Sequence, residues 1–557
     1  MTKGEGAPAP ARQVRPFGES AFVVGPLAQE DPDEMVANLR ELRDVEEVVP
    51  GPQILVRTSS RDARPLMAEV DSLIPYIDRK QGRTHGGRLL EIPVRFDSSQ
   101  GPDLEAVARS VGMEVTQLIA NLAETELRVE YLGFSPGFAY MTGLPEPLAR
   151  IGRRTRPRTS IPAGSVGIAG GYVGIYPQAS PGGWNLVGRA HTVMFDPFVP
   201  PYATLRPADR VRLLPTDQRG TPPPMRNISL RPRCASARRI VVEQPGTLTT
   251  LQDSGRRGVA HLGVPRAGPA DPHSMSLANL IVGNDTASGV LEATVRGPLL
   301  RFDATSHAAV VGAGVELDGR RMEPGAVIEV PAGARLRITA CDGLRAYMAV
   351  SGGIRGPELF GSCSSDMLSG LGLGALSPGD ELELGNPGNP RGYAASPFAQ
   401  QRPVVRVLPG PDLNRQGSPG SHGSRGVDRL REWAAGPFVV STDSNRVGVR
   451  LAAKTPQGAP PTRHEHRSYG MIEGAVQLLP SGEAIALLCD HATMGGYPVV
   501  ATVVSADIGA LAQKRPGDVV QFDVVALDEA LEARSAVDRW LARAPTGRYP
   551  AGPASLA

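Results

Sequence analysis

The stretch that decides the fold is Tyr131-Leu-Gly-Phe-Ser-Pro-Gly-Phe-Ala-Tyr140, in which short apolar runs are broken by glycine and proline. The same pattern of short apolar runs continues to about residue 215. Strands this short, separated by turn signals this regular, are typical of a β-barrel or β-sandwich. The sequence therefore predicts a barrel or a sandwich over residues 91–215.

Ahead of this region, strand-like and helical segments alternate. Residues 20–24 form an apolar strand pattern, and residues 31–42 carry Met35, Leu39 and Leu42 at helical spacing. Residues 64–77 form a second helical segment. This alternation predicts a small α/β domain over residues 13–90.

Downstream, residues 216–238 are rich in proline and arginine, have no hydrophobic period, and are interpreted as a linker. Two further all-β regions are predicted over residues 239–385 and 402–526, followed by a terminal helix and tail over 527–557. The 65 glycines and 53 prolines fit many short strands joined by tight turns. The expected fold class is mainly β with an α/β N-terminal part.

An internal echo links the two ends of the chain. Residues 163–166 (Ala-Gly-Ser-Val) precede a Pro-Gly-Gly-Trp turn at 181–184, and residues 473–476 (Glu-Gly-Ala-Val) precede a Gly-Gly-Tyr-Pro turn at 495–498. Either two β domains share turn chemistry by chance, or related barrels occur in both halves of the chain.

Composition excludes several classes of function. The 59 basic and 57 acidic residues give a net charge of +2, so no basic face for nucleic acid is indicated. No signal peptide and no apolar run of membrane-spanning length is visible. The four cysteines are widely spaced, which suits a reducing cytoplasm. Residues 464–466 (His-Glu-His) lack a third ligand at a recognisable spacing, so no metal site is predicted.

Several motifs of the first half, taken together, are specific. They are Gly18-Glu-Ser-Ala21, Val49-Pro-Gly51, Tyr131–Tyr140, Pro157-Arg-Thr159, Ile161–Val166 and Ser180-Pro-Gly-Gly-Trp184. With these motifs, this half resembles allophanate hydrolase subunit 1, the KipI-type family that includes the B subunit of 5-oxoprolinase, over about residues 13–215.

The second half carries a further set of motifs: Pro245–Asp253, Gly255-Arg256, His261–Pro265, Asp271, Leu277–Asn284, Leu291-Glu292, Gly352–Ile354, Gly361-Ser362, Asp366, Leu408–Pro411 and Gly495–Pro498. With these motifs it resembles allophanate hydrolase subunit 2, the KipA-type family that includes the C subunit of 5-oxoprolinase, over about residues 239–525.

The two resemblances imply tandem cyclophilin-like β-barrels, one in the first half and two in the second. They also imply a role in opening 5-oxo-L-proline to L-glutamate with ATP and Mg²⁺ as cofactors. A separate LamB/YcsF-type A subunit would be the partner, because nothing in this chain resembles it. A homo-oligomer is a further possibility.

Candidate site residues follow from the chemistry of a resonance-stabilised lactam. Activation by phosphorylation needs cations for phosphate and carboxylate, and donors where negative charge develops. The predicted catalytic residues are Arg158, Arg256, Asp271 and Gln252. The predicted substrate- or ATP-binding residues are Tyr140, Gly164, Gly182, Gly183, Trp184, Asp253, Gly495 and Gly496. No GxxxxGK[ST] phosphate loop occurs.

Three positions depart from the family patterns. Leu122 stands where a histidine is expected, Cys363 replaces an arginine, and Glu473 occupies a proline position. Losses around one expected groove would indicate a changed substrate or reduced catalysis. Alternative functions are a carboxyltransferase-like enzyme for urea or related amides using carboxybiotin in trans, a KipI/KipA-like regulator of a sensor histidine kinase, and a diverged enzyme of secondary metabolism.

Overall fold

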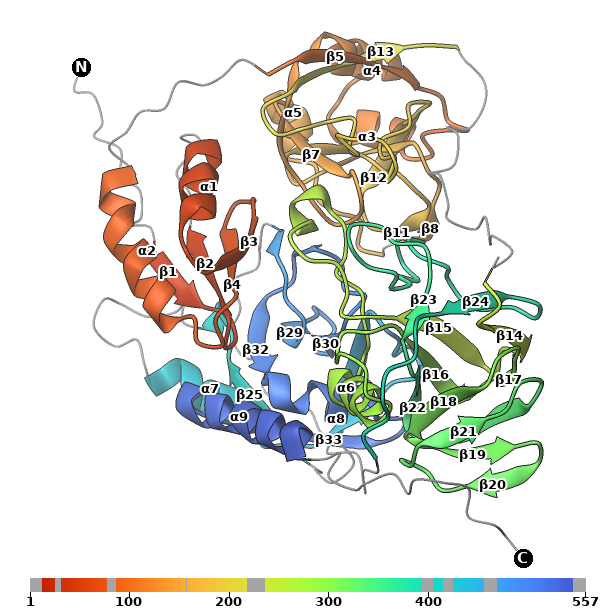
Figure 1. Ribbon diagram of the computed structural model, residues 1–557. Coiled ribbons are helices and arrows are strands. Elements are labelled where there is room, and N and C mark those ends of the chain that lie inside the picture. The colour runs from red at the N-terminus through yellow and green to blue at the C-terminus, as the bar shows by residue number, and fades with distance from the viewer. Residues whose placement is uncertain are drawn as a thin grey trace, which may run out of the picture.

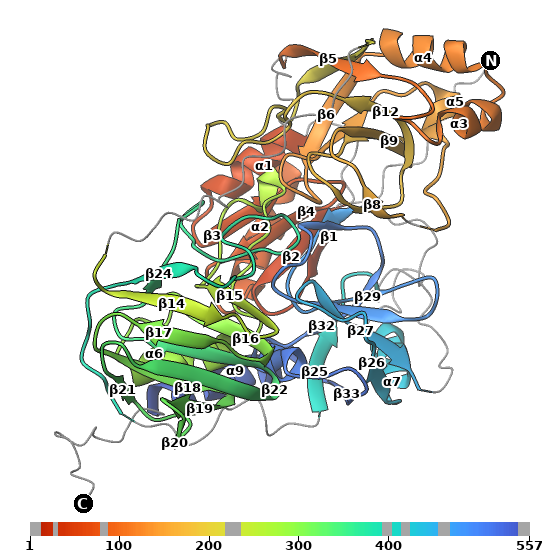
Figure 2. The same cartoon turned by 90° about the vertical axis from the view of Figure 1, so that its right-hand side faces the viewer.

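Four bodies make up the protein: an N-terminal α/β domain, a first barrel, a middle sheet and a second barrel. The computed structural model describes residues 13–25, 32–77, 87–156, 158–217, 236–392, 404–413, 424–454 and 468–543. The first barrel stands above the middle sheet and the second barrel in both views (Figures 1 and 2). No helix within these described ranges is long and apolar enough to cross a membrane.

The α/β domain packs two helices on a four-stranded antiparallel sheet of order β1-β2-β4-β3. Its buried core joins helix residues such as Met35 and Leu66 to strand residues such as Phe22 and Val56. Both predicted helices are present. The elements are β1 (Gln13–Pro16), β2 (Ala21–Gly25), α1 (Pro32–Glu41), β3 (Val45–Val49), β4 (Ile54–Thr58) and α2 (Arg64–Ile77).

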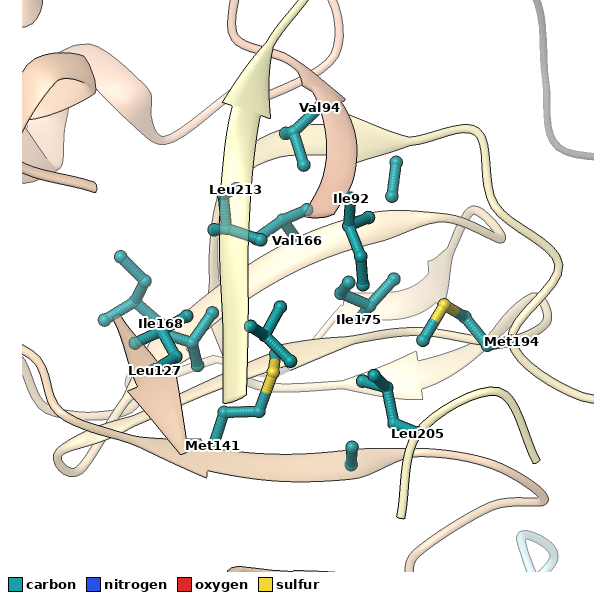
Figure 3. Close-up of a cluster of buried hydrophobic side chains, with 14 of the residues drawn as sticks. Ile92, Val94, Leu127, Met141, Val166, Ile168, Ile175, Met194, Leu205 and Leu213 are labelled. Carbon is teal, nitrogen blue, oxygen red and sulfur yellow. The ribbon is translucent and has the colours of Figure 1, made fainter. Parts of the chain in front are cut away.

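The first barrel is a closed ring of order β10-β7-β6-β13-β5-β12-β9 with one parallel pair, β13 and β5. Figure 3 shows its packed interior, where Ile92, Val166, Ile175 and Leu213 point toward one another. The elements are β5 (Leu89–Arg95), α3 (Leu104–Ser110), α4 (Val115–Glu124), β6 (Leu127–Leu132), β7 (Ala139–Thr142), α5 (Glu146–Ala149), β8 (Arg158–Ile161), β9 (Ser165–Ala169), β10 (Tyr172–Ile175), β11 (Ser180–Gly182), β12 (Asn185–Ala190) and β13 (Arg210–Pro215).

The middle sheet has eleven strands and is branched, because the 16-residue strand β22 pairs with β16, β17, β18 and β19. It wraps one apolar core. The elements are β14 (Arg239–Gln244), β15 (Leu248–Gln252), η1 (Ala260–Leu262), α6 (Pro272–Ile281), β16 (Val290–Arg296), β17 (Leu299–Phe302), β18 (Ser306–Val311), β19 (Ala313–Leu317), β20 (Arg320–Met322), β21 (Ile328–Val330), β22 (Arg335–Val350), β23 (Ile354–Arg355) and β24 (Glu381–Leu384).

The second barrel is closed, with order β25-β32-β29-β30-β27-β26-β33. The terminal helix α9 packs against η4 and α6. The elements are β25 (Val404–Pro409), α7 (Ser424–Ala434), β26 (Phe438–Val440), β27 (Gly448–Ala453), β28 (Tyr469–Gly470), β29 (Ala475–Leu478), β30 (Ala484–Leu487), β31 (Met494–Gly495), β32 (Val499–Val503), η4 (Ser505–Asp507), α8 (Ile508–Ala512), β33 (Val519–Val524) and α9 (Leu527–Arg543).

The two closed barrels share one topology. Strands β5, β6, β7, β9, β10, β12 and β13 correspond in ring order and in pairing direction to β25, β26, β27, β29, β30, β32 and β33. Each barrel also carries a separate two-stranded sheet, β8 with β11 and β28 with β31. The echo at residues 163–166 and 473–476 opens the equivalent strands β9 and β29, so it reflects related barrels and not shared turn chemistry alone.

A shared apolar core holds the α/β domain and both barrels together. It contains Phe17 from the first body, Tyr140 and Trp184 from the first barrel, and Tyr469 and Met494 from the second. The rings of Tyr131 and Tyr140 are stacked 4.7 Å apart, and those of Phe17 and Tyr469 lie 6.3 Å apart. Aromatic groups of this size bury much area and dominate interface energetics, so this core fixes the relative position of three bodies.

Gly133 tests this junction. A Cβ atom at Gly133 would lie 2.1 Å from Cγ of Met494. We expect Gly133→Ala to destabilise the fold by about 1–3 kcal/mol through overpacking, read as a lower thermal midpoint. Gly152→Ala is the matched control because its Cβ meets nothing within 4 Å. Equal midpoints for the two variants would contradict the described packing.

Candidate functional site

A cavity of about 180 Å³ lies between the α/β domain, the loop after η1 and the second barrel. We call it the interdomain pocket. Both halves of the chain build it. The first half contributes Gly18, Glu19, Ser20, Ala21, Glu46 and Arg57, and the second half contributes Arg266, Ala267, Ile472, Glu473, Cys489, His491, Thr502, Val503, Ser505, Ile508 and Arg534.

Local backbone structure places the polar groups in this pocket. Arg57 lies on β4 opposite Ala21 of β2. Arg266 lies on the loop after η1, and its backbone carbonyl accepts a hydrogen bond from the Arg256 N–H at 2.7 Å. Glu473 precedes Gly474, which has a φ of +85°. A side chain at Gly474 would also press on the Val503 carbonyl, so glycine here allows the tight turn that presents Glu473.

Two carboxyl groups in the pocket are partly withdrawn from water. Burial raises the pKa of Glu19, and its two oxygens accept from the Ser505 backbone N–H and hydroxyl, both at 2.9 Å. Burial also raises the pKa of Glu473, although Arg266 and Arg57 oppose that shift. Glu19 thus has partners in the protein, whereas Oε1 of Glu473 is buried and bonds to no described residue.

The pocket cations are engaged to different degrees. Arg57 donates to the Met471 carbonyl at 2.8 Å, and its Nε lies 3.7 Å from Glu47. Burial, together with the nearby charges of Arg257 and Arg57, lowers the pKa of Arg266. An arginine in this setting stays charged, so the pocket presents positive charge to any small anion that enters.

His491 is a neutral imidazole with a defined tautomer. It is 3% exposed, and burial together with the charge of Arg57 lowers its pKa to about 4. Its Nδ1 lies 2.8 Å from the Ala492 carbonyl. Since a carbonyl only accepts, Nδ1 carries the proton and Nε2 keeps a lone pair. The ring therefore offers a hydrogen-bond acceptor.

This state predicts how stability responds to acid. Because the folded pKa of His491 is about 4 against an ordinary value of 6.5, the folded protein binds fewer protons than the unfolded chain between these values. Stability should therefore fall as pH drops below about 6.5. His491→Asn keeps a donor for the Ala492 carbonyl but cannot be protonated. Between pH 7.5 and 5, we expect the free energy of unfolding of this variant, measured in urea, to fall by about 1–2 kcal/mol less than that of the parent protein. Parallel pH profiles would refute this assignment.

Behind the pocket, a buried polar network joins the middle sheet to the second barrel. Arg446 donates two bonds to Asp490, both at 2.9 Å, one to the Gly268 carbonyl at 2.7 Å, and a further one to Glu292. Glu292 also accepts from Tyr347 at 2.8 Å. Arg446 is 5% exposed and Asp490 is fully buried. Removing the cation would leave Asp490 without its two hydrogen bonds from Arg446 and Glu292 with Arg345, 3.6 Å away, as its nearby cation.

Arg446→Met tests the network. Breaking one side of a buried ion pair costs about 3–5 kcal/mol, so we expect a large drop in thermal midpoint. Arg150→Met removes an arginine from the exposed pair with Glu146 and should change little. If the two variants melted alike, the network would not join these bodies.

Four predicted residues gather in or beside this network. Asp271 caps α6 by accepting from the N–H groups of His273 and Ser274. Asp253 accepts from the hydroxyls of Ser362 and Ser364 and from the Cys363 N–H, and so ties down the loop at 361–366.

Arg256 and Gln252 occupy the same buried region. Arg256 is 2% exposed and donates to the Ser364 carbonyl, while Gln252 donates to Thr250 and to the Ser365 carbonyl. Burial and the charge of Asp490 raise the pKa of nearby Asp366 to about 6. The side chain of Arg256 thus lies in the buried region beside the network. Arg266, which is on the same loop, lines the interdomain pocket instead.

The remaining predicted residues lie in the first barrel and at its junction with the second. Tyr140 and Trp184 belong to the shared apolar core, and Arg158 makes a bidentate ion pair with Asp103, both bonds at 2.9 Å. Gly164 lies in the turn before β9, Gly182 is the last residue of β11, and Gly183 follows it. Gly495 and Gly496 lie close to Gln477 and Arg153. None of the twelve predicted residues lines the interdomain pocket.

The three family departures do not surround one groove. Leu122 is buried in the first-barrel core with Leu118, and Cys363 lies in the loop held by Asp253. Only Glu473 lines the pocket. The three departures therefore do not line the interdomain pocket together, and the expected change of substrate or loss of catalysis stays a prediction. The His-Glu-His tripeptide at residues 464–466, at which the sequence predicts no metal site, lies outside the described residues.

Sequence reasoning missed Arg57, Arg266 and His491. Gly18-Glu-Ser-Ala21 was one signal, because this quoted motif lines the pocket. Glu473 was the other, as a charged residue at a family proline position.

Family models match most of the described chain. The carboxyltransferase domain, subdomains C and D, matches residues 12–205, and the carboxyltransferase domain, subdomains A and B, matches residues 262–524. The chain belongs to this carboxyltransferase-domain family, in the form that fuses subunit 1-type and subunit 2-type halves.

Relatives divide along the same line. The 5-oxoprolinase C subunit of Escherichia coli is 34% identical over 313 residues, which is 54% of this chain and 96% of the relative. The 5-oxoprolinase B subunit of Haemophilus influenzae is 35% identical over 209 residues, 36% of this chain and 96% of the relative. Urea amidolyase of Saccharomyces cerevisiae is 30% identical over 54% of this chain but only 17% of its own length. The crystal structure of TTHA0988 covers 92% of this chain and all of its own, with 32% identity and a TM-score of 0.77.

Proposed function

We propose that this chain is the B–C component of an ATP-dependent 5-oxoprolinase, which opens 5-oxo-L-proline to L-glutamate with a separate LamB/YcsF-type A subunit. The observation that carries the proposal is the composite pocket. Its polar groups come from the first, B-type half at Glu19 and Arg57 and from the second, C-type half at Arg266, Glu473 and His491. Fusion keeps the two halves of this site at equal stoichiometry.

The pocket suits a small acid better than a nucleotide. A dry cavity of about 150 Å³ accommodates benzene, so about 180 Å³ accommodates a five-membered ring with a carboxylate. Drug-sized ligands occupy roughly 300–1,000 Å³, and a nucleotide belongs to that class. The pocket residues therefore do not fit ATP, and we assign no step at this site to it.

Mg²⁺ is the second cofactor that the family resemblance implies. Mg²⁺ prefers several oxygen ligands in octahedral geometry. Within the described part of the chain, no group of three or more His, Cys, Asp or Glu side chains is arranged to hold a metal ion. We propose that nucleotide and magnesium act in the assembled enzyme with the A subunit. In this chain the pocket residues would hold the acid, and its arginines would neutralise the carboxylate.

Glutamate release tests the proposal. The purified chain is mixed with the LamB/YcsF-type subunit of the same genome, 5-oxo-L-proline, ATP and Mg²⁺. We expect glutamate to form only when both proteins and ATP are present. Omission of each component is the control. Absence of glutamate, while a 5-oxoprolinase of known activity turns over in the same assay, would contradict the proposal.

A second function is favoured by the likeness to urea amidolyase, which covers 54% of this chain. We propose as the alternative a carboxyltransferase-like reaction on urea or a related amide, with carboxybiotin supplied in trans. Transfer of labelled carboxylate from carboxybiotin to urea, without glutamate release, would favour this alternative over the first.

A further inference from the structure

The interdomain pocket holds opposite charges that do not pair with each other. Within the described part of the chain, the Arg266 guanidinium donates no hydrogen bond and joins no ion pair, although Glu473 is among the charges acting on it. Oε1 of Glu473 is also buried without a hydrogen-bond partner among the described residues. Both groups line the same cavity of about 180 Å³. The cavity thus separates a cation from an anion.

Leaving the buried Oε1 of Glu473 without a hydrogen-bond partner is unfavourable. A charge withdrawn from water costs free energy unless it is paired and hydrogen-bonded. A ligand that brings both an anionic group and a hydrogen-bond donor would satisfy both ends at once.

The other polar groups extend the same division into donors and acceptors. Arg57 already donates to the Met471 carbonyl, but its Nε has no hydrogen-bond partner within the described ranges. His491 is neutral and keeps its Nε2 lone pair because Nδ1 faces the Ala492 carbonyl. Arg57 and Arg266 are therefore hydrogen-bond donors of the pocket, and Glu473 and His491 are acceptors.

We propose that the interdomain pocket binds a small monocarboxylate that carries an N–H group next to the carboxylate. The carboxylate lies on Arg57 and Arg266, and the ligand N–H donates to Glu473, which makes Glu473 the residue that selects an amide over an ester. This assignment deepens the proposed function and rests on it for the choice of 5-oxo-L-proline as probe. Ligands lacking either group would leave one side of the pocket unsatisfied.

Three small probes separate the two contacts. 5-Oxo-L-proline has both groups, 5-oxotetrahydrofuran-2-carboxylate replaces the ring N–H by oxygen, and 2-pyrrolidinone lacks the carboxylate. Calorimetric titration of the full chain should give the tightest binding for 5-oxo-L-proline. Loss of one charge-assisted hydrogen bond should weaken the lactone acid by about tenfold or more, and 2-pyrrolidinone by at least as much.

Variants of the full chain assign the contacts to residues. Glu473→Met should erase the preference for lactam over lactone, because it removes the acceptor and keeps the volume. Arg266→Met should weaken both acids by about tenfold or more. Arg150→Met is the control, since Arg150 is exposed, pairs with Glu146, and neither residue lines the pocket. It should change neither affinity. Thermal midpoints report whether each variant is folded.

The outcomes distinguish this assignment from the proposed function. Equal binding of lactam and lactone acids by the parent chain, no binding of either acid, or equal effects of Arg266→Met and Arg150→Met would overturn the assignment, even if glutamate release succeeds. The predicted pattern of affinities would support it, even if the glutamate assay fails.

Discussion

Burial of one aromatic core between three bodies is the constraint on which the rest of the structure depends. Phe17, Tyr140, Trp184 and Tyr469 come from distant parts of the sequence and pack as one cluster. Because protein interiors are close-packed, this cluster fixes the α/β domain against the second barrel. Arg57 then reaches the Met471 carbonyl, 414 positions away in the chain. The pocket is a consequence of that fixed contact.

Behind the pocket, polar groups that are fully paired serve a different purpose from those that are not. Arg446 satisfies Asp490 and Glu292 and joins the middle sheet to the second barrel. Such satisfied networks rigidify a structure. Arg266 and Glu473 share a cavity without pairing, which is the arrangement expected of a preorganised binding site. The loop from 253 to 268 links the buried network to the interdomain pocket, because it places Arg256 beside the network and Arg266 in the pocket.

Local sequence signals were enough to predict most of the fold. The period of residues 64–77 predicts α2, and the repeated Gly-small-Val motif indicates the second barrel's relation to the first. The site was harder to predict, since which arginine faces a cavity depends on packing between β4 and β28. Family motifs favoured Arg158 and Arg256, whereas the structure gives Arg158 an ion pair with Asp103 and turns Arg256 inward. Two signals in the sequence fall on the pocket: the Gly18-Glu-Ser-Ala21 motif and the position where Glu473 replaces proline.

We propose that the acid binds between the two halves of the chain, in the interdomain pocket. The most direct measurement is a crystal structure of the full chain grown with 5-oxo-L-proline. The account predicts density for the acid in the interdomain pocket, with its carboxylate on Arg57 and Arg266 and its ring nitrogen toward Glu473. Density for the acid at another location, such as the barrel junction near Tyr140 and Arg153, with the pocket filled only by water, would contradict it.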